Sequence, residues 1–438
     1  MAHFLTEVVA SQAAGRHAGI YSVCSAHRYA IEAAMQQALT DGIPVLIEAT
    51  SNQVDQFGGY TGMTPVQFAA YVHGIAEAVH FPAAKILLGG DHLGPNRWRD
   101  QPAEEAMSEA RDLVQAYVMA GFVKIHLDTS MRLGDDPGDG QIPPEPSLVA
   151  ERAADLAAVA EETYAARSGK ALPPLYIIGT DVPKPGGADE PAGRVHVTSP
   201  EEAQQTIEDH QAVFRGRGLD AAWGRVIGIV VQPGVEFGSE QVEEYQRPRA
   251  ADLSRLIEGY DRLVYEAHST DYQTGAALGQ MVEDHFAILK VGPWLTFAFR
   301  EGVFALAQME SEWLSVRKSV TPSRLREVLE EVMSAQPQYW QGYYKGTAQQ
   351  QRYARVYSYS DRIRYYWPVK EVEEALNRLL QNITAHPFPM TLVSQYLPSQ
   401  YRAIREGQIA NTPTDILRDK IMEVTALYSL ACGYSGHH

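Results

Sequence analysis

Short apolar runs alternate with longer amphipathic stretches along the first 310 residues of the chain. A continuous apolar run is typical of a parallel strand that is buried on both faces, and apolar residues that recur every three or four positions predict helices. We expect strands at residues 19–24, 45–49, 85–89, 124–127, 175–179, 226–231, 263–266 and 287–291. We expect helices at residues 28–39, 65–79, 103–119, 147–166, 200–214, 250–260, 272–286 and 295–311.

Eight strand–helix units predict a (β/α)8 barrel, the TIM-barrel fold of the α/β class, over residues 1–311. A doubly wound open sheet is the alternative, but it often carries a Gly-rich dinucleotide loop that this sequence lacks. Residues 312–438 are rich in Tyr, Gln and Arg, with strongly aromatic segments at 336–344 and 357–368. We expect a mainly helical C-terminal extension packed on the barrel. Its aromatic side chains serve packing and subunit contacts, or alternatively stack on a sugar ring.

Composition and charge narrow the range of partners. The chain has 438 residues, a formal net charge of −17 and two cysteines, Cys24 and Cys432. The acidic balance argues against nonspecific binding to nucleic acid or anionic membranes, which requires clustered Lys and Arg. No apolar run reaches the ~18 residues of a membrane span, and no signal peptide is recognisable at the N-terminus. With two distant cysteines, we expect a reducing compartment, the cytoplasm.

Polar side chains gather where the predicted strands end. In a barrel the C-terminal ends of the strands converge on one face, so these side chains should form one site. Asp91 and His92 follow the third strand, Asp181 follows the fifth and His268 follows the seventh. Two imidazoles and a carboxylate leave positions open on Zn²⁺ or a similar ion for substrate oxygens. The alternative is that both histidines are structural residues held by hydrogen bonds.

The fourth predicted strand offers a second polar pair, His126 and Asp128. They alternate with Ile125 and Leu127 and therefore share one face of the strand. On the interior face they would transfer protons or bind substrate, or else form a structural hydrogen-bond network. Lys124 and Lys290, also on apolar strands, raise the alternative of imine-forming aldol chemistry.

Two loops invite functional interpretations. The Gly-containing loop at residues 56–62 is a candidate phosphate cradle, or simply a turn. Residues 183–191 form a Pro- and Gly-rich connection that is a candidate lid. Because no GxxxxGK[ST] loop occurs, an ATP-dependent kinase is poorly supported.

Long motifs resemble those of the GatZ/KbaZ family, described as the non-catalytic subunit of class II D-tagatose-1,6-bisphosphate aldolase. The resemblance covers nearly the whole chain. It is carried by IEATSNQV at 47–54, QFGGYTGMTP at 56–65, GGDHLGPN at 89–96, KIHLD at 124–128, VVQPGVEF at 230–237, VYEAHSTDYQT at 264–274 and SDRIRYYWP at 360–368.

The family is in turn similar to the zinc-dependent class II aldolases. That similarity implies an acid/base at Asp91, metal ligands at His92 and His268, and a further ligand at Asp181. Where those aldolases carry another histidine after strand six, this chain has Gln232, with Glu236 nearby; a Gln or Glu oxygen would complete the metal site. The metal we expect is a divalent ion, foremost Zn, with Mn, Ni or Co as alternatives. Further substrate-binding candidates are Glu48, Asn52, Glu236, Ser269, Asp271 and Lys290.

Two functions follow from the resemblance. Some family members interconvert tagatose and fructose, or their 6-phosphates, by epimerisation at C4, for which Asp91, His126 and Asp128 would supply acid/base groups. The reaction would proceed by retro-aldol cleavage of C3–C4 or by proton or hydride movement at C4. Alternatively, the chain is a non-catalytic partner that stabilises a separate aldolase subunit. We expect the enzyme, acting on a small ketose or ketose phosphate, and a homo-oligomer.

Overall fold

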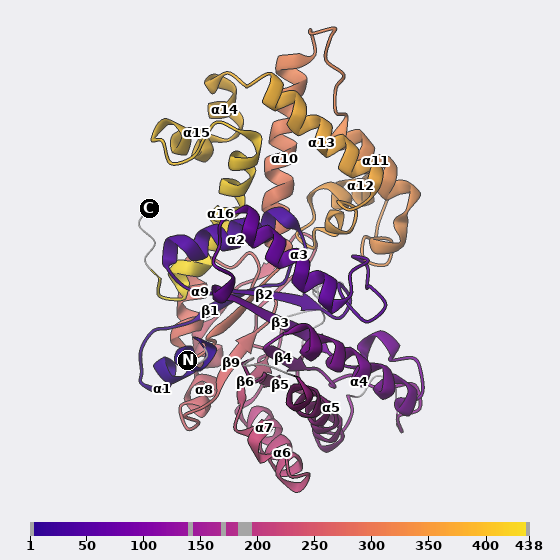
Figure 1. The fold of residues 1–438 in the computed structure, drawn as a ribbon, viewed down its shortest axis with the longest axis vertical. Helices are drawn as coiled ribbons and strands as arrows, with labels where there is room; N and C mark the ends of the chain where they lie inside the picture. The colour runs from indigo at the N-terminus through magenta and orange to yellow at the C-terminus, as the bar shows by residue number, and fades with distance from the viewer. Residues whose placement is uncertain (1–3, 139–142, 168–171, 183–194, 435–438) are drawn as a thin grey trace.

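The computed structural model describes residues 4–138, 143–167, 172–182 and 195–434. Within them, eight parallel strands close a barrel in the order β1-β10-β9-β6-β5-β4-β3-β2 (Figure 1). The predicted TIM barrel is thereby confirmed, and the candidate lid at 183–191 lies outside the described residues. The barrel strands are β1 (Ile20–Val23), β2 (Val45–Thr50), β3 (Ile86–Leu93), β4 (Lys124–Leu127), β5 (Leu175–Ile178), β6 (Val226–Val231), β9 (Val264–Ala267) and β10 (Ile288–Val291).

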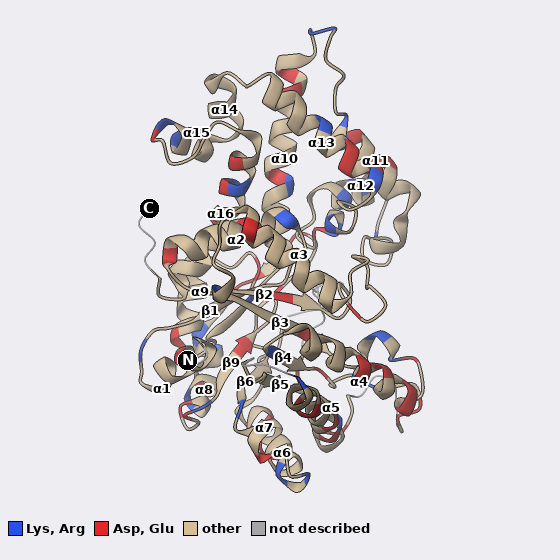
Figure 2. Cartoon of the chain, in the orientation of Figure 1, with Lys and Arg blue, Asp and Glu red and all other residues tan. Residues whose placement is uncertain are grey.

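Helices surround the barrel as the sequence pattern predicts. They are α2 (Arg28–Asp41), α3 (Pro65–Ala78), α4 (Ala103–Ala120), α5 (Pro146–Ala166), α6 (Pro200–Gly216), α7 (Asp220–Trp223), α8 (Arg247–Ile257), α9 (Gly275–Glu283) and α10 (Pro293–Leu314). A small antiparallel pair, β7 (Glu236–Phe237) and β8 (Val242–Glu243), follows β6. Acidic and basic residues are interspersed along the outer helices (Figure 2). None of the helices in the described ranges has the length and apolarity needed to cross a membrane.

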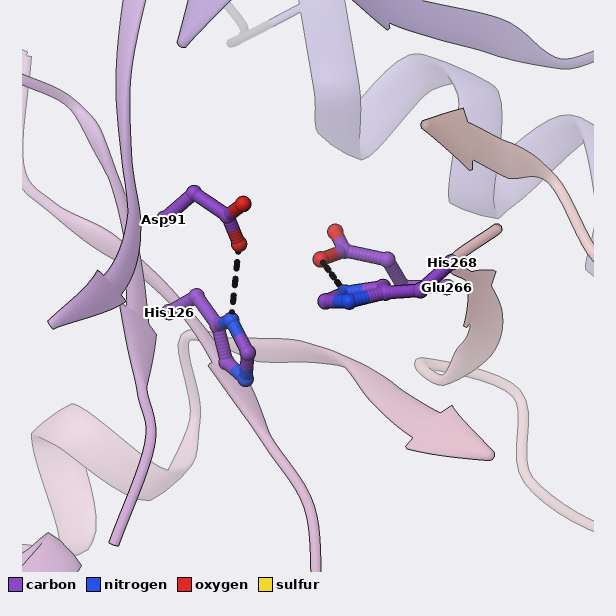
Figure 3. A group of neighbouring side chains, drawn as sticks. All are labelled: Asp91, His126, Glu266 and His268. Atoms are coloured by element: carbon purple, nitrogen blue, oxygen red, sulfur yellow. Dashed lines mark hydrogen bonds and ion pairs between the residues drawn. The ribbon is translucent and has the colours of Figure 1, made fainter. Parts of the chain in front are cut away.

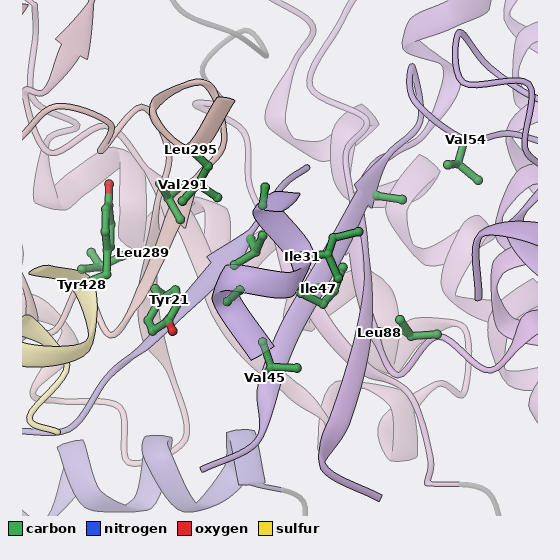
Figure 4. Packing of buried hydrophobic residues seen from close by; sticks show 14 of the residues in the cluster. Tyr21, Ile31, Val45, Ile47, Val54, Leu88, Leu289, Val291, Leu295 and Tyr428 are labelled. Atoms are coloured by element: carbon green, nitrogen blue, oxygen red, sulfur yellow. The ribbon is translucent and has the colours of Figure 1, made fainter. Parts of the chain in front are cut away.

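Successive side chains of a strand point alternately towards the surrounding helices and into the barrel, which divides the core into two layers. On β2, Val45, Ile47 and Ala49 face the surrounding helices and join the large apolar cluster, part of which Figure 4 shows. Leu46 joins a smaller cluster that fills the N-terminal end of the barrel. Helix α1 (Phe4–Ala13), which the sequence pattern did not predict, contributes three apolar side chains to this smaller cluster. The N-terminal end of the barrel is therefore sealed by apolar packing, and polar interior residues lie towards the C-terminal end.

The C-terminal extension is mainly helical, as expected. Its helices are α11 (Leu325–Ala335), α12 (Ala348–Tyr357), α13 (Lys370–Ala385), α14 (Met390–Tyr396), α15 (Pro398–Arg405) and α16 (Pro413–Ala431), and the short helix η4 (Arg362–Tyr365) lies between α12 and α13. The last helix, α16, returns to pack against α2, α9 and α10 (Figure 1). It covers the barrel between its seventh and first outer helices, where a (β/α)8 fold needs its eighth. The division at residue 311 lies within α10 and stays a prediction.

Contacts from α16 and β10 hold the loop that follows β9. The Tyr428 hydroxyl donates to the Thr270 carbonyl at 2.8 Å, and the Thr270 hydroxyl donates to the Lys290 carbonyl at 2.6 Å. Tyr428 also packs on Tyr21 of β1, with ring centroids 6.0 Å apart (Figure 4). The Asp271 carboxylate accepts the backbone N–H groups of Gly292 at 3.0 Å and Trp294 at 2.8 Å. The polar residues of this loop are thus fixed by elements far away in sequence.

Replacement of Tyr428 by Phe tests this anchoring. The substitution removes the hydroxyl and leaves the buried Thr270 carbonyl without its donor, so the free energy of unfolding should fall by about 1–3 kcal/mol. Urea denaturation measures it. Tyr401→Phe is the matched control, because the Tyr401 hydroxyl bonds a surface arginine, Arg405. This substitution should change the free energy of unfolding by less than about 0.5 kcal/mol. Equal effects of the two substitutions would contradict the anchoring role.

Asp271 should make stability depend on pH. Burial raises the pKa of its carboxyl from the usual 3.8 to about 6, despite the two backbone N–H groups that it accepts. The folded state therefore binds the proton more tightly than the unfolded state, and wild-type stability should decline as pH rises from about 4 to about 6. Asp271→Asn keeps an oxygen acceptor without the charge. Above pH 6 this variant should be more stable than wild type by up to about 3 kcal/mol. A wild-type-to-variant difference that stays constant between pH 4 and 7 in urea denaturation would refute this.

Candidate active site

Alternation along the strands brings charged side chains into the barrel interior. Lys124 and Glu266 are fully buried, and Lys290 is 5% exposed. The Lys124 ammonium lies 2.6 Å from Glu48 and 2.7 Å from Glu266. The Lys290 ammonium pairs with Glu48 and lies 2.8 Å from Asp91. One buried ionic network thus joins five strands. Its lysines come from β4 and β10, and its carboxylates come from β2, β3 and β9.

This network decides the charge state of the lysines. Burial alone would lower the pKa of Lys124 and of Lys290, but the neighbouring carboxylates outweigh it and raise both pKa values. A charged ammonium group is not a nucleophile. The structure therefore disfavours the imine alternative for both lysines, whose role is to compensate buried carboxylates.

A bulge aims two consecutive residues of β3 at the site. The register between β3 and β4 shifts between Gly90 and Leu93, and His92 adopts a left-handed φ of 50°. A bulge places neighbouring side chains on the same side of a strand. Asp91 consequently reaches His126, with Oδ1 and Nδ1 3.0 Å apart, while His92 reaches Asp128, with Nδ1 and Oδ2 2.7 Å apart.

Three imidazole rings meet at this point. The ring centroids are 4.9 Å apart for His92 and His268, 5.1 Å for His92 and His126, and 5.3 Å for His126 and His268. Each ring has its own carboxylate, because Glu266 lies 3.1 Å from His268 Nε2. Figure 3 shows Asp91 and His126 facing Glu266 and His268 across the site. A carboxylate that orients each imidazole is the arrangement found around histidine-ligated metal ions.

His268 and His92 differ in protonation, and so in how readily each can ligate a metal ion. Burial lowers the pKa of His268 to about 4, so this ring is neutral at neutral pH and has a lone pair for a metal. Burial would also lower the pKa of His92, but the Asp91 and Asp128 carboxylates more than offset this and raise it. Ligation of a cation by His92, which stays a prediction, would therefore require the ring to release a proton.

Charge balance also fits a cation. Lys124 and Lys290 pair with the buried carboxylates of Glu48, Asp91 and Glu266, and a fourth buried carboxylate, that of Asp128, contacts His92. Two negative charges are left without a lysine to balance them, and a divalent ion would neutralise both. Asp91, His126, Glu266 and His268 offer ligand atoms that all lie within 4.8 Å of one another. The buried His126 Nε2 has no hydrogen-bond partner among the described residues. The residues present therefore fit a divalent metal ion.

A cavity of about 610 Å³ opens above this cluster, a size typical of small-molecule sites. On the barrel side it is lined by seven predicted residues: Asn52, Asp91, His92, His268, Ser269, Asp271 and Lys290. The opposite wall comes from the C-terminal extension, including Tyr343, Arg362, Arg364, Tyr365 and Trp367. The extension therefore completes the site.

Three predicted residues do not join the histidine cluster. Asp181 is partly exposed and bonds His196 at 2.9 Å and Thr198 at 2.5 Å. The Gln232 side-chain oxygen accepts the backbone N–H groups of Gly234 and Val235. Glu236 lies on β7, next to Phe237, which lines the cavity. Metal ligation by Asp181 and Gln232, and substrate binding by Glu236, stay predictions.

Sequence reasoning missed two parts of the site. Glu266 was assigned to an apolar strand without a role, although it precedes His268 by two positions and so shares its face. The same alternation that identified His126 and Asp128 would have found it. The two arginines of η4 carried no such signal, because η4 belongs to neither a strand nor a long helix.

Three solved structures and one family model are similar to this chain. A crystal structure described as a probable tagatose 6 phosphate kinase from Sinorhizobium meliloti 1021 is 46% identical, with a TM-score of 0.85, and covers 94% of this chain and 100% of its own. The YdjI aldolase from Escherichia coli K12 is 11% identical with a TM-score of 0.41, covering 86% of this chain and 95% of its own. A fructose-bisphosphate aldolase from Campylobacter jejuni is 15% identical with a TM-score of 0.41, covering 87% and 91%. The model of the D-tagatose-1,6-bisphosphate aldolase subunit GatZ/KbaZ-like family matches residues 5–433, and the chain therefore belongs to that family.

Proposed function

We propose that the protein is a metal-dependent enzyme that inverts C4 of a ketohexose or its 6-phosphate and so interconverts fructose and tagatose forms. The observation that carries the proposal is the group of three histidines, each oriented by its own carboxylate. The group opens into a cavity large enough for a hexose phosphate. A zinc-like divalent ion is the cofactor that suits three imidazole ligands.

A cation bound among the imidazoles supplies Lewis-acid stabilisation of the negative charge that develops on substrate oxygens. The protein's own part is to move one proton. Burial would raise the pKa of Asp91, but His92 and Lys290 hold it well below its usual range, so the carboxylate is ionised at neutral pH. Asp91 Oδ1 is engaged by His126 and Lys290, whereas Oδ2 lies 3.6 Å from His92 Nε2, beyond hydrogen-bond distance. Oδ2 is therefore the oxygen that we assign to accept a proton from the C4 hydroxyl.

Retro-aldol cleavage accounts for inversion with this single proton. As Asp91 takes the C4 hydroxyl proton, C4 becomes an aldehyde and the C3–C4 bond breaks. Its electron pair moves to C3, where the C2 carbonyl delocalises it. The aldehyde turns, C3–C4 forms again on its other face, and Asp91 returns the proton to the C4 oxygen. Direct removal of the C4 hydrogen as a proton has no such delocalisation, because C4 is not adjacent to the carbonyl carbon.

A non-catalytic role beside a separate aldolase subunit is the second candidate. It is favoured by the family description, which names an aldolase subunit. The two candidates differ in what the purified chain does alone.

The first test assays the purified chain with fructose 6-phosphate, tagatose 6-phosphate and both free ketoses, with and without EDTA. We expect epimerisation that EDTA abolishes and a divalent ion restores. Asp91→Asn removes the proton acceptor and should lower kcat by about 10²–10⁴-fold. Asp112→Asn, on the exposed side of α4, is the matched control and should leave kcat unchanged. An inactive chain that nevertheless restores a cognate aldolase subunit on mixing would contradict the enzyme and establish the partner role.

Metal content provides a test that does not depend on turnover. After EDTA treatment and reloading, we expect about one divalent ion per chain by elemental analysis. His268→Ala should weaken binding by more than the roughly 10–100-fold that loss of an orienting residue causes. His73→Ala, on the exposed face of α3, should bind the ion like wild type. If wild type and His268→Ala retain the same amount of metal, His268 is not a ligand.

A further inference from the structure

The wall that the extension contributes to the cavity contains an arginine without an ion pair. Arg362 is 5% exposed and lines the cavity. Its Nε and Nη2 atoms have no hydrogen-bond partner among the described residues. The guanidinium instead lies over the Tyr343 ring, 3.1 Å from its centroid. A buried charge without a counter-charge is unfavourable, so this group needs an explanation.

Other arginines buried to a similar degree differ from Arg362 in having a carboxylate partner. Arg152, Arg300 and Arg355 are each at most 8% exposed, and each pairs with a carboxylate. In the part of the chain that the structure describes, Arg362 has no such pair. The three paired arginines have structural partners, whereas Arg362 lies beside a cavity and has none. An anionic ligand in the cavity would supply the missing partner.

The backbone around Arg362 is held firmly in place. Asp361 has a left-handed φ of 43°. Its carboxylate accepts the Thr296 hydroxyl at 2.7 Å and Arg300 Nε at 3.3 Å, both from α10. The backbone N–H of Arg362 donates to the Tyr344 hydroxyl at 3.2 Å. Arg362 is therefore positioned before any ligand arrives, which reduces the entropy lost on binding.

Arg364 places a second positive charge at the same wall. Its guanidinium donates to the backbone carbonyls of Ser360 and Asp361 and, at 3.0 Å, to the Tyr365 hydroxyl. It also lines the cavity. None of these hydrogen-bond partners is a carboxylate; the carboxylates of Asp361 and Asp271 interact with the guanidinium only electrostatically. The extension thus presents two guanidinium groups to the cavity, whereas the buried carboxylates of the barrel leave an excess of negative charge.

The Gly-containing loop does not offer an alternative anion site. The Asp55 carboxylate already accepts the N–H groups of Phe57 at 2.7 Å and Gly59 at 2.9 Å. Asp55 also pairs with Arg97. The loop therefore satisfies its own donors, and the interpretation as a turn is the better one.

We infer that Arg362, supported by Arg364, forms an oxyanion subsite for the terminal phosphoryl group of the substrate. The substrate class is then a ketose phosphate rather than a free ketose. A guanidinium group binds phosphoryl oxygens through paired N–H donors, which a neutral sugar hydroxyl group does not require. The identity of the sugar rests on the proposed function, but the binding of the anion does not.

Binding to the full-length chain tests the inference independently of catalysis. Isothermal titration calorimetry with inorganic phosphate, fructose 6-phosphate, free fructose and a hexuronate compares the anions. We expect both phosphate compounds to bind and fructose 6-phosphate to bind at least about tenfold more tightly than fructose. Arg362→Gln should weaken binding of both phosphate compounds by at least about tenfold. Arg362→Lys keeps the charge without the planar fork and should weaken it less.

Control variants separate anion binding by Arg362 from a structural role of the same residue. Arg352→Gln removes an exposed arginine of the same extension, outside the cavity, and should bind phosphate like wild type. If Arg362→Gln does not fold, Arg362→Lys and the rise in the wild-type Tm with phosphate, at constant ionic strength, provide the test. For the active chain, Arg362→Gln should raise KM for the 6-phosphate by at least about tenfold, whereas Arg352→Gln should leave this KM unchanged.

Several outcomes would overturn the inference: no phosphate binding by wild type, equal affinity for fructose and fructose 6-phosphate, or unchanged phosphate binding by Arg362→Gln. Binding of the hexuronate without binding of phosphate would replace the phosphoryl group by a carboxylate and also overturn it. Phosphate binding through Arg362 in a chain that epimerises no sugar would support the subsite and refute only the proposed enzyme.

Discussion

The site depends on the compensation of buried carboxylates by two interior lysines. Without Lys124, the fully buried Glu48 and Glu266 would lack the ammonium group that lies between them. Isolated carboxylates in such surroundings would take up protons rather than remain charged. Burial would raise the pKa of Glu266, but Lys124 and Lys290 hold it well below its usual range, so this carboxylate stays charged. The two lysines do not balance every buried carboxylate, and the remaining negative charge is concentrated around the histidines. That excess raises the pKa of His92 and makes the cluster suitable for a divalent cation.

The extension matters to the site because it supplies charge of the opposite sign. The barrel closes its N-terminal end with apolar packing from α1, so ligands must enter from the end where the polar residues lie. There η4 forms part of the cavity wall. The last helix, α16, packs on the barrel itself and anchors the loop after β9 through Tyr428. Barrel and extension therefore form one cavity, negative near the histidines and positive near η4, which matches a sugar with a phosphoryl group at one end.

The strands were predictable from local pattern, because each is a short apolar run buried on both faces. The end of β3 was not predictable in this way. The apolar pattern ends the strand at residue 89, yet pairing continues through a bulge to Leu93. A bulge depends on the neighbouring strand, so a single stretch of sequence does not reveal it. Asp91, His92 and His268 could be placed together because barrel geometry converges strand ends. Glu266 could have been added to them, since it lies two positions before His268 and shares its face of the strand. Arg362 could not, since its importance lies in the lack of a counter-charge, which only the folded chain reveals.

The energetics of the cluster bear on the choice between enzyme and partner subunit. Burying several charges in a barrel is unfavourable, and apolar side chains of similar volume often give equal or greater stability. A subunit that only stabilised another protein would be more stable with apolar side chains in place of these charges. The N-terminal half of the same barrel interior is filled in that way. Instead the C-terminal half keeps two lysines, four carboxylates and three histidines in mutual contact, beside a strained φ at His92. Backbone strain and buried charge together at one cavity are typical of sites that perform chemistry, which favours the enzyme.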